Sequence, residues 1–152
     1  MIVLSGRDLN KEYISRDRKV RPLQHVDFDL HQGEILGIVG ESGSGKSVSS
    51  LAVMKLIPNP PGRITEGSII YNGKDLVTAT EKEMQSIRGN EISMIFQEPM
   101  TSLNPTYTIG KQLMEAIMLH TDRNKKQAYD RAVEMLKLVN VNEPEKRMKQ
   151  YP

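Results

Sequence analysis

The chain has 152 residues, no cysteine and a formal net charge of +2. Its length suits one domain with its own hydrophobic core, and the missing cysteines exclude a disulfide framework or a cysteine-based metal site and favour a reducing cytosol. Because 21 basic residues face 19 acidic ones and no apolar run nears the roughly 20 residues of a membrane span, neither dedicated nucleic-acid binding nor a transmembrane segment is expected.

Strand and turn patterns fill the chain before residue 40. The basic stretch 16–21 predicts a solvated loop, and residues 23–30 alternate apolar and acidic side chains, which predicts a half-exposed strand. A turn at 31–33 follows. The apolar run 35–39 then predicts a buried strand.

Residues 40–47 read Gly-Glu-Ser-Gly-Ser-Gly-Lys-Ser and fit the phosphate-loop pattern G-x-x-x-x-G-K-[ST] at every fixed position. Such a loop turns its backbone N–H groups toward phosphate oxygens, and the following helix, expected over 48–54, adds the positive end of its dipole. The alternative is a chance Gly/Ser-rich turn. The predicted nucleotide-binding residues of the loop are Gly40, Glu41, Ser42, Gly43, Ser44, Gly45, Lys46 and Ser47. Lys46 can reach the terminal phosphates and the Ser47 hydroxyl can bind Mg²⁺.

Further elements follow in alternation. Residues 58–62 are rich in proline and predict a loop, and 64–71 predict a strand that Asn72-Gly73 turns into a hairpin. Thr80 and Glu83 form a capping box for a short helix that ends near Gly89. The other expected elements are a strand over 92–96 and helices over 108–120 and 124–140, the last with an apolar stripe of Ala128, Ala132, Val133, Leu136 and Val139.

Residues 95–105 read Ile-Phe-Gln-Glu-Pro-Met-Thr-Ser-Leu-Asn-Pro. By itself, Gln97 at the end of an apolar strand can bind a metal ion or orient a water, or simply mark a turn. Together with residues 40–47, the segment closely resembles the ATP-binding subunits of ABC transporters, and most of all the oligopeptide/dipeptide (or nickel) importer branch. The resemblance implies that Gln97 binds Mg²⁺ and couples nucleotide state to the membrane subunits. It also places Tyr13 where the family stacks an aromatic ring on adenine, although a packing role for Tyr13 stays open.

The resemblance also implies an architecture. The fold class is α/β, a P-loop NTPase of the ABC ATPase type with an N-terminal antiparallel β subdomain and a helical subdomain. Residues 1–152 would form the N-terminal part of one ABC ATP-binding domain, with the β subdomain and phosphate-loop core in 1–97 and the Q-loop and helical subdomain in 98–152. The implied partners are transmembrane permease subunits and a second ATP-binding subunit, with no nucleic acid. The implied location is cytoplasmic, peripheral on the inner face of the cell membrane.

The chain departs from the family pattern in what it lacks. No Leu-Ser-Gly-Gly signature and no Walker B strand ending in Asp-Glu occurs in the 152 residues. We therefore expect a chain truncated before the signature, with the C-terminal half of the core missing and strand edges left open. The intact protein is expected to be an ATP hydrolase that uses ATP and Mg²⁺ to drive import of peptides or related small solutes. This chain alone is expected to bind nucleotide weakly and to hydrolyse it hardly at all.

Two other readings remain. The chain could be a nucleotide-binding fragment or regulatory module without hydrolysis, or a soluble ABC-type protein that acts on DNA or the ribosome. The near-neutral charge and residues 95–105 count against the last of these.

Overall fold

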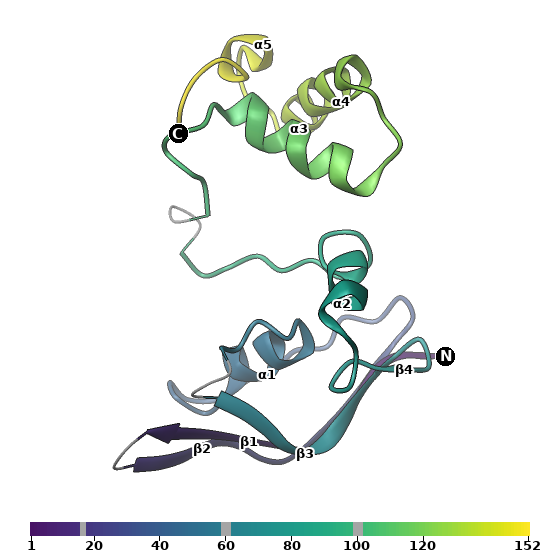
Figure 1. The fold of residues 1–152 in the computed structure, drawn as a ribbon, viewed down its shortest axis with the longest axis vertical. Helices are drawn as coiled ribbons and strands as arrows, with labels where there is room; N and C mark the ends of the chain where they lie inside the picture. The colour runs from purple at the N-terminus through teal and green to yellow at the C-terminus, as the bar shows by residue number, and fades with distance from the viewer. Residues whose placement is uncertain (16–17, 59–61, 99–101) are drawn as a thin grey trace. The chain divides into compact units, whose positions relative to one another are not determined.

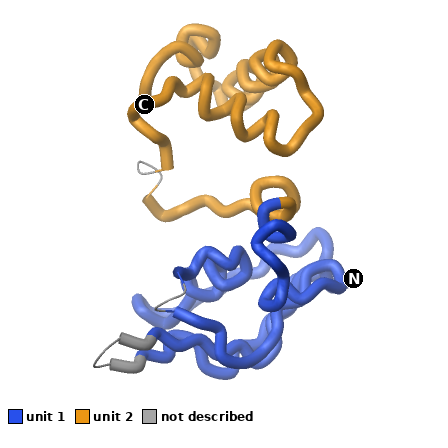
Figure 2. Tube along the Cα trace, viewed as in Figure 1, with its two compact units in different colours: residues 1–85 blue, residues 86–152 orange. Residues whose placement is uncertain are grey.

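The computed structural model describes residues 1–15, 18–58, 62–98 and 102–152, which form two compact units, 1–85 and 86–152 (Figure 2). Three predicted segments therefore fall partly outside the described residues. These are the basic stretch at 16–17, the proline-rich loop at 59–61 and the 95–105 segment at 99–101.

An antiparallel sheet forms most of the first unit (Figure 1). Its strands, in the spatial order β2-β1-β3-β4, are β1 (Ile2–Ser15), β2 (Arg18–His31), β3 (Gly62–Tyr71) and β4 (Lys74–Asp75). The strands predicted over 23–30 and 64–71 are confirmed within β2 and β3. The solvated loop predicted over 16–21 is wrong for residues 18–21, because the hairpin with β1 continues through them and pairs Val20 with Tyr13. Helix α1 (Lys46–Val53), predicted after the glycine-rich loop, lies against this sheet (Figure 1).

The β3–β4 hairpin turns where Asn72-Gly73 predicted it. Asn72 and Gly73 have φ values of 46° and 81°, the positive values that a type I′ turn requires at both central positions. Asp75 then stabilises the corner, since its carboxylate accepts hydrogen bonds from the backbone N–H groups of Ile69 and Val77. The fully buried side chains that this sheet and its neighbours enclose are Leu9, Ile69, Leu76 and Met84.

Helix α2 (Glu81–Ile87) begins with the predicted capping box. The Glu83 carboxylate accepts from the Thr80 N–H at 2.7 Å, and the Thr80 hydroxyl accepts from the Glu83 N–H at 3.3 Å. Lys74 Nζ lies 2.6 Å from the other carboxylate oxygen. The hydrogen bond from Lys74, followed by those from Thr80, lowers the pKa of Glu83 from its ordinary 4.5 to about 2.

A Glu83→Gln variant should therefore lose stability in a pH-dependent way. A carboxylate with a depressed pKa in the folded state stabilises the fold above its unfolded pKa, and that contribution disappears as the pH falls through the folded pKa. The parent should be more stable than the variant at pH 7, and the difference should shrink between pH 4.5 and 2. Urea unfolding of both proteins at pH 7 and pH 3 measures this. A difference that is equal at the two pH values would contradict the assignment.

Two predicted strands are not formed. Residues 35–39 have no strand structure, and Ile35 and Val39 are 97% and 93% exposed. Of residues 92–96, only Ile92 makes an isolated bridge, to Arg88, while Ile95 is 94% exposed. Both segments are apolar as a buried strand would be, but a strand forms only where hydrogen bonds to a neighbouring strand are available. Within the described segments, nothing supplies a neighbour to residues 35–39.

Helices form the regular structure of the second unit (Figure 1). They are α3 (Ile109–His120), α4 (Lys125–Leu138) and the short α5 (Pro144–Arg147), which was not predicted. Thr108 caps α3 and Asn124 caps α4 through a capping box with Gln127. The helices enclose a core of Ala132, Val133 and Met148, with Leu113, Met114, Ile117, Tyr129 and Leu136 packed around it.

One member of the predicted apolar stripe is misplaced. Val139 is 69% exposed because α4 ends at Leu138, and Asn140 takes a left-handed conformation just beyond it. Across the described segments, no helix has the length and hydropathy needed to cross a bilayer.

Gly110 sets how closely α3 approaches the C-terminal segment. Its N–H donates to the Met148 carbonyl at 2.9 Å, and a Cβ at this position would lie 2.5 Å from the same oxygen. A Gly110→Ala variant should thus destabilise the second unit by about 1–3 kcal/mol through overpacking, more than the gain in helix propensity returns.

Amide hydrogen exchange in α3 and α4 measures this loss, and the exposed substitution Glu115→Ala on the same helix serves as the control. Unchanged protection in Gly110→Ala, or equal loss in the control, would contradict the packing argument.

Candidate nucleotide-binding site

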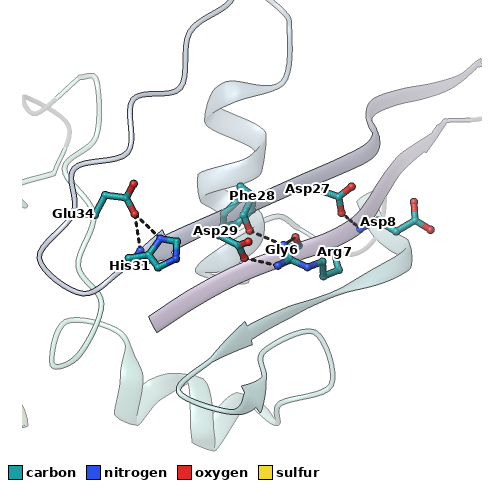
Figure 3. Close-up of polar contacts among 8 residues, drawn as sticks. All are labelled: Gly6, Arg7, Asp8, Asp27, Phe28, Asp29, His31 and Glu34. Carbon is teal, nitrogen blue, oxygen red and sulfur yellow. Dashed lines mark hydrogen bonds and ion pairs between the residues drawn. The ribbon is translucent and has the colours of Figure 1, made fainter. Parts of the chain in front are cut away.

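The site begins at the turn that leads from β2 toward residues 40–47. Glu34 Oε2 accepts a hydrogen bond from the His31 N–H at 2.8 Å and lies 2.9 Å from His31 Nδ1 (Figure 3). The backbone hydrogen bond from His31 is the main reason that the pKa of Glu34 is lowered. The carboxylate thereby closes the turn that directs the chain away from the sheet.

The loop itself is shaped by glycines. Gly43 and Gly45 have φ values of 83° and 94°, which side-chain-bearing residues rarely adopt. At Gly40 a Cβ would lie 2.6 Å from Ser44 Oγ, so the loop also closes too tightly there for a side chain. The Ser44 N–H donates to the Glu41 carbonyl at 3.2 Å and completes the curl. The loop is thus tightly curled, and its binding of phosphate stays a prediction.

Gly45 joins the loop to the sheet. A Cβ at this position would lie 2.5 Å from the Pro22 carbonyl oxygen and 3.0 Å from Leu23 Cδ2, so only glycine allows this approach to β2. Ser49, buried in α1, donates its hydroxyl to the Gly45 carbonyl at 3.1 Å, a local bond within the start of the helix. The contributions of Pro22 and Leu23 could not be predicted, because the loop pattern carries no information about long-range contacts.

Lys46 places its ammonium inside the loop. Nζ donates to the carbonyls of Gly40 at 2.7 Å and Glu41 at 2.6 Å, and lies 3.3 Å from Ser44 Oγ. The positive charge is thus held where the loop backbone converges. That Lys46 serves bound phosphates stays a prediction.

The start of α1 suits an anion as well. No side chain caps its first turn, and that turn contains no acidic residue. The N–H groups there are available to oxygen acceptors, and the helix dipole favours negative charge at the same end. Together with Lys46 and the glycine-shaped backbone, these residues fit a nucleotide phosphate group.

The residues fit Mg²⁺ only in a limited way. Ser47 is exposed, at the second residue of α1, and offers one hydroxyl oxygen. Among the described residues, no group of three or more His, Cys, Asp or Glu side chains could hold a metal ion. A Mg²⁺ ion would therefore take most of its ligands from nucleotide phosphates and water and few from the protein, as is usual for Mg²⁺ in nucleotide sites.

Tyr13 lies in the same unit as the loop, near the end of β1. It pairs with Val20 of β2 and Gly62 of β3, and its ring is half-buried. A Cβ on Gly62 would lie 2.7 Å from Tyr13 Cε1, so the ring packs closely on that glycine. Lys11 Nζ lies over the ring, 5.6 Å from its centroid. Tyr13 therefore packs against its neighbours, and the accessible part of its ring leaves open the predicted stacking on adenine.

Gln97 lies in the second unit, in a segment without regular secondary structure, and is exposed. Residues 40–47 and Tyr13, in contrast, belong to the first unit. A shared Mg²⁺ site of Ser47 and Gln97 stays a prediction.

Comparison with known proteins shows the family of this chain. The family model described as ABC transporter matches residues 23–151. The chain belongs to this family.

Several similar proteins are named as peptide transport proteins. The chain is 53% identical over 150 residues to the oligopeptide transport ATP-binding protein OppD of Bacillus subtilis (strain 168), an alignment that covers 99% of this chain and 42% of OppD. It is 47% identical to the dipeptide transport ATP-binding protein DppD of the same organism and 45% identical to DppD of Escherichia coli (strain K12), covering 45% and 46% of these proteins. The chain therefore spans less than half the length of these relatives.

Solved structures support the fold. A dimeric post-hydrolysis state of the ATP-binding cassette MJ0796, bound to ADP and Pi, matches with a TM-score of 0.82 at 22% identity, over 98% of this chain and 61% of that one. A second dimeric structure of MJ0796, described as a bacterial ABC transporter cassette, matches equally well. The predicted fold class, the N-terminal part of an ABC ATPase domain, is confirmed.

Proposed function

We propose that the protein to which this chain belongs is the ATP-binding subunit that powers ABC-type import of peptides or related small solutes. The observation that carries the proposal is the loop at 40–47, where the Lys46 ammonium, glycine-shaped backbone and uncapped helix start converge. The solute class is supported by the relatives, which are named as oligopeptide and dipeptide transport proteins.

Each predicted site residue has a physical role in this proposal. The amides of residues 40–45 and the Lys46 ammonium bind and orient the phosphates, and the Ser47 hydroxyl holds Mg²⁺. Tyr13 stacks on the base. Gln97 contacts Mg²⁺ and reports nucleotide state to the transporter. When bound, Mg²⁺ neutralises charge on the phosphates during transfer.

The proposal also keeps the predicted organisation and partners. Residues 1–97 would provide the β subdomain and phosphate-loop core, and residues 98–152 the Q-loop and helical subdomain that contacts the permease. A second ATP-binding subunit would complete the site, as the dimeric MJ0796 structures suggest by analogy. The proposed location is cytoplasmic, on the inner face of the membrane.

Hydrolysis requires more than these 152 residues provide. The chain supplies phosphate binding but contains neither a Leu-Ser-Gly-Gly sequence nor an apolar strand ending in Asp-Glu. Hydrolysis needs a group that orients the attacking water and further donors for the transferring phosphoryl group. We infer an ATP hydrolase in the intact protein and near-zero turnover for this chain alone.

Peptide uptake by cells tests the proposal. Replacing the chromosomal copy by a Lys46→Ala version should abolish uptake of radiolabelled di- or oligopeptides, and a Gln97→Ala version should do so while its purified protein still binds Mg-ATP. Lys74→Ala, which removes a surface charge of the same unit, is the control. Normal peptide uptake by the Lys46→Ala cells would contradict the proposal. Nucleotide binding with no effect of either variant on uptake would favour a regulatory module.

A further inference from the structure

Lys11 of β1 is a largely buried residue whose cation lies beside the predicted base-stacking residue. It is only 3% exposed, and burial lowers its pKa. Its Nζ lies 5.6 Å from the centroid of the Tyr13 ring. Within the described part of the chain, the ammonium has no hydrogen bond or ion pair. The ammonium itself is not sealed from water, because among the described residues no side-chain nitrogen or oxygen is both buried and without a hydrogen-bond partner.

The Tyr13 ring is the group over which the Lys11 ammonium lies. An aromatic face attracts a cation, and the attraction is larger where water is excluded. Gly62 also packs closely against the ring, since a Cβ there would lie 2.7 Å from Cε1 and 3.1 Å from Cδ1. Lys11 and Gly62 together hold the ring in one orientation, while its half-buried state leaves surface for a ligand.

The strand register connects this pair to the phosphate loop. Lys11 pairs with Leu23, and Leu23 is the residue whose Cδ2 lies 3.0 Å from a Cβ on Gly45. Tyr13 is two residues farther along β1, roughly 7 Å in a regular strand. A ligand whose phosphates lie in the loop would thus have its base near this end of β1.

We propose that Lys11 is a positioning residue for the nucleotide base: its ammonium holds the Tyr13 ring in place and thereby presents the accessible part of the ring to adenine. This rests on the proposed function, in which Tyr13 stacks on the base. Lys11 itself does not touch the phosphates. Its loss should weaken only ligands that carry a base.

Calorimetric titration of the 152-residue chain with Mg-ATP and with Mg-pyrophosphate separates these possibilities. Lys11→Met keeps the apolar stem and removes the charge. It should raise the Kd for Mg-ATP about 2- to 10-fold and leave the Kd for Mg-pyrophosphate unchanged. Lys11→Arg, which keeps a cation over the ring, should bind Mg-ATP as the parent does. Lys111→Met is the matched control, because Lys111 lies 3.4 Å from the centroid of the Tyr107 ring in the other unit.

The failure modes are distinct. Equal weakening of both ligands, or no rescue by Lys11→Arg, would show that Lys11 acts only through folding and would overturn the inference. Unchanged Mg-ATP affinity in Lys11→Met would overturn it as well. If Tyr13→Ala leaves the ratio of Mg-ATP to Mg-pyrophosphate affinity unchanged, base stacking on Tyr13 fails, and the inference fails with it. If Tyr13→Ala lowers that ratio and Lys11→Met does not, only the role of Lys11 fails.

A measurement on the unaltered chain covers the case in which Lys11→Met does not fold. With ¹³Cε-labelled lysine, the Lys11 signal, assigned from the spectrum of Lys11→Arg, should shift on addition of Mg-ATP and stay in place with Mg-pyrophosphate. A signal that ignores Mg-ATP, or that responds equally to both ligands, would contradict the proposal.

Discussion

Lys46→Ala should all but abolish binding of Mg-ATP by this chain. The ammonium donates hydrogen bonds to the Gly40 and Glu41 carbonyls of the loop, and we propose that it contacts bound phosphates. Truncating one partner of a hydrogen-bonded charge pair costs about 2–5 kcal/mol, roughly 30-fold to several-thousand-fold in Kd. Calorimetric titration with Mg-ATP measures the loss.

The control for this variant is Lys74→Ala, which removes the same charge from an exposed ion pair of the first unit. Its Mg-ATP affinity should match that of the parent. Circular dichroism should show that Lys46→Ala is folded. If folded Lys46→Ala bound Mg-ATP as tightly as the parent, the site assignment would be wrong.

Gly45→Ala should have the second large effect, through the sheet rather than through charge. The new Cβ would lie 2.5 Å from the Pro22 carbonyl oxygen, and the φ of 94° is strained for alanine. Such strain costs about 1–3 kcal/mol before any clash is counted. The loop can relieve the clash only by moving away from β2, so we expect lower stability of the first unit and a severe loss of Mg-ATP binding.

Gly33→Ala separates strain from collision. Gly33 also has a positive φ, 75°, but a Cβ there would meet no atom within 4 Å. This variant should lose some stability by urea unfolding and keep its Mg-ATP affinity. Equal Mg-ATP affinities of Gly45→Ala and Gly33→Ala would show that the contact with Pro22 does not shape the loop.

Local signals in the sequence predicted most of the fold. The Asn72-Gly73 turn and the capping box at Thr80 depend on residues close in the chain, and the structure confirms both. The capping box at Asn124 is equally local but was not predicted. The apolar periodicity of α3 and α4 was equally informative, since their packed faces repeat at helical spacing.

The sequence was misleading where structure depends on distant partners. Residues 35–39 and 92–96 have the composition of strands, but a strand also needs a neighbour to hydrogen-bond with. No described segment supplies a neighbour to residues 35–39, and residues 92–96 make only one isolated bridge. The contact of Gly45 with Pro22 and the position of Lys11 over Tyr13 were also unforeseen. The first contact joins the loop to a residue of β2 that is far away in the chain. The second joins two residues of β1 that share one face of the strand, and strand alternation alone does not specify where a long side chain ends.

Calorimetric titration of the unaltered 152-residue chain with Mg-ATP, with phosphate release assayed on the same sample, tests the central claim most directly. The loop geometry predicts saturable binding that Lys46→Ala removes, with no measurable phosphate release. A folded chain that shows no binding would contradict the claim that residues 40–47 form a working phosphate site in this chain. Release of phosphate that depends on Lys46 would contradict the expected lack of turnover.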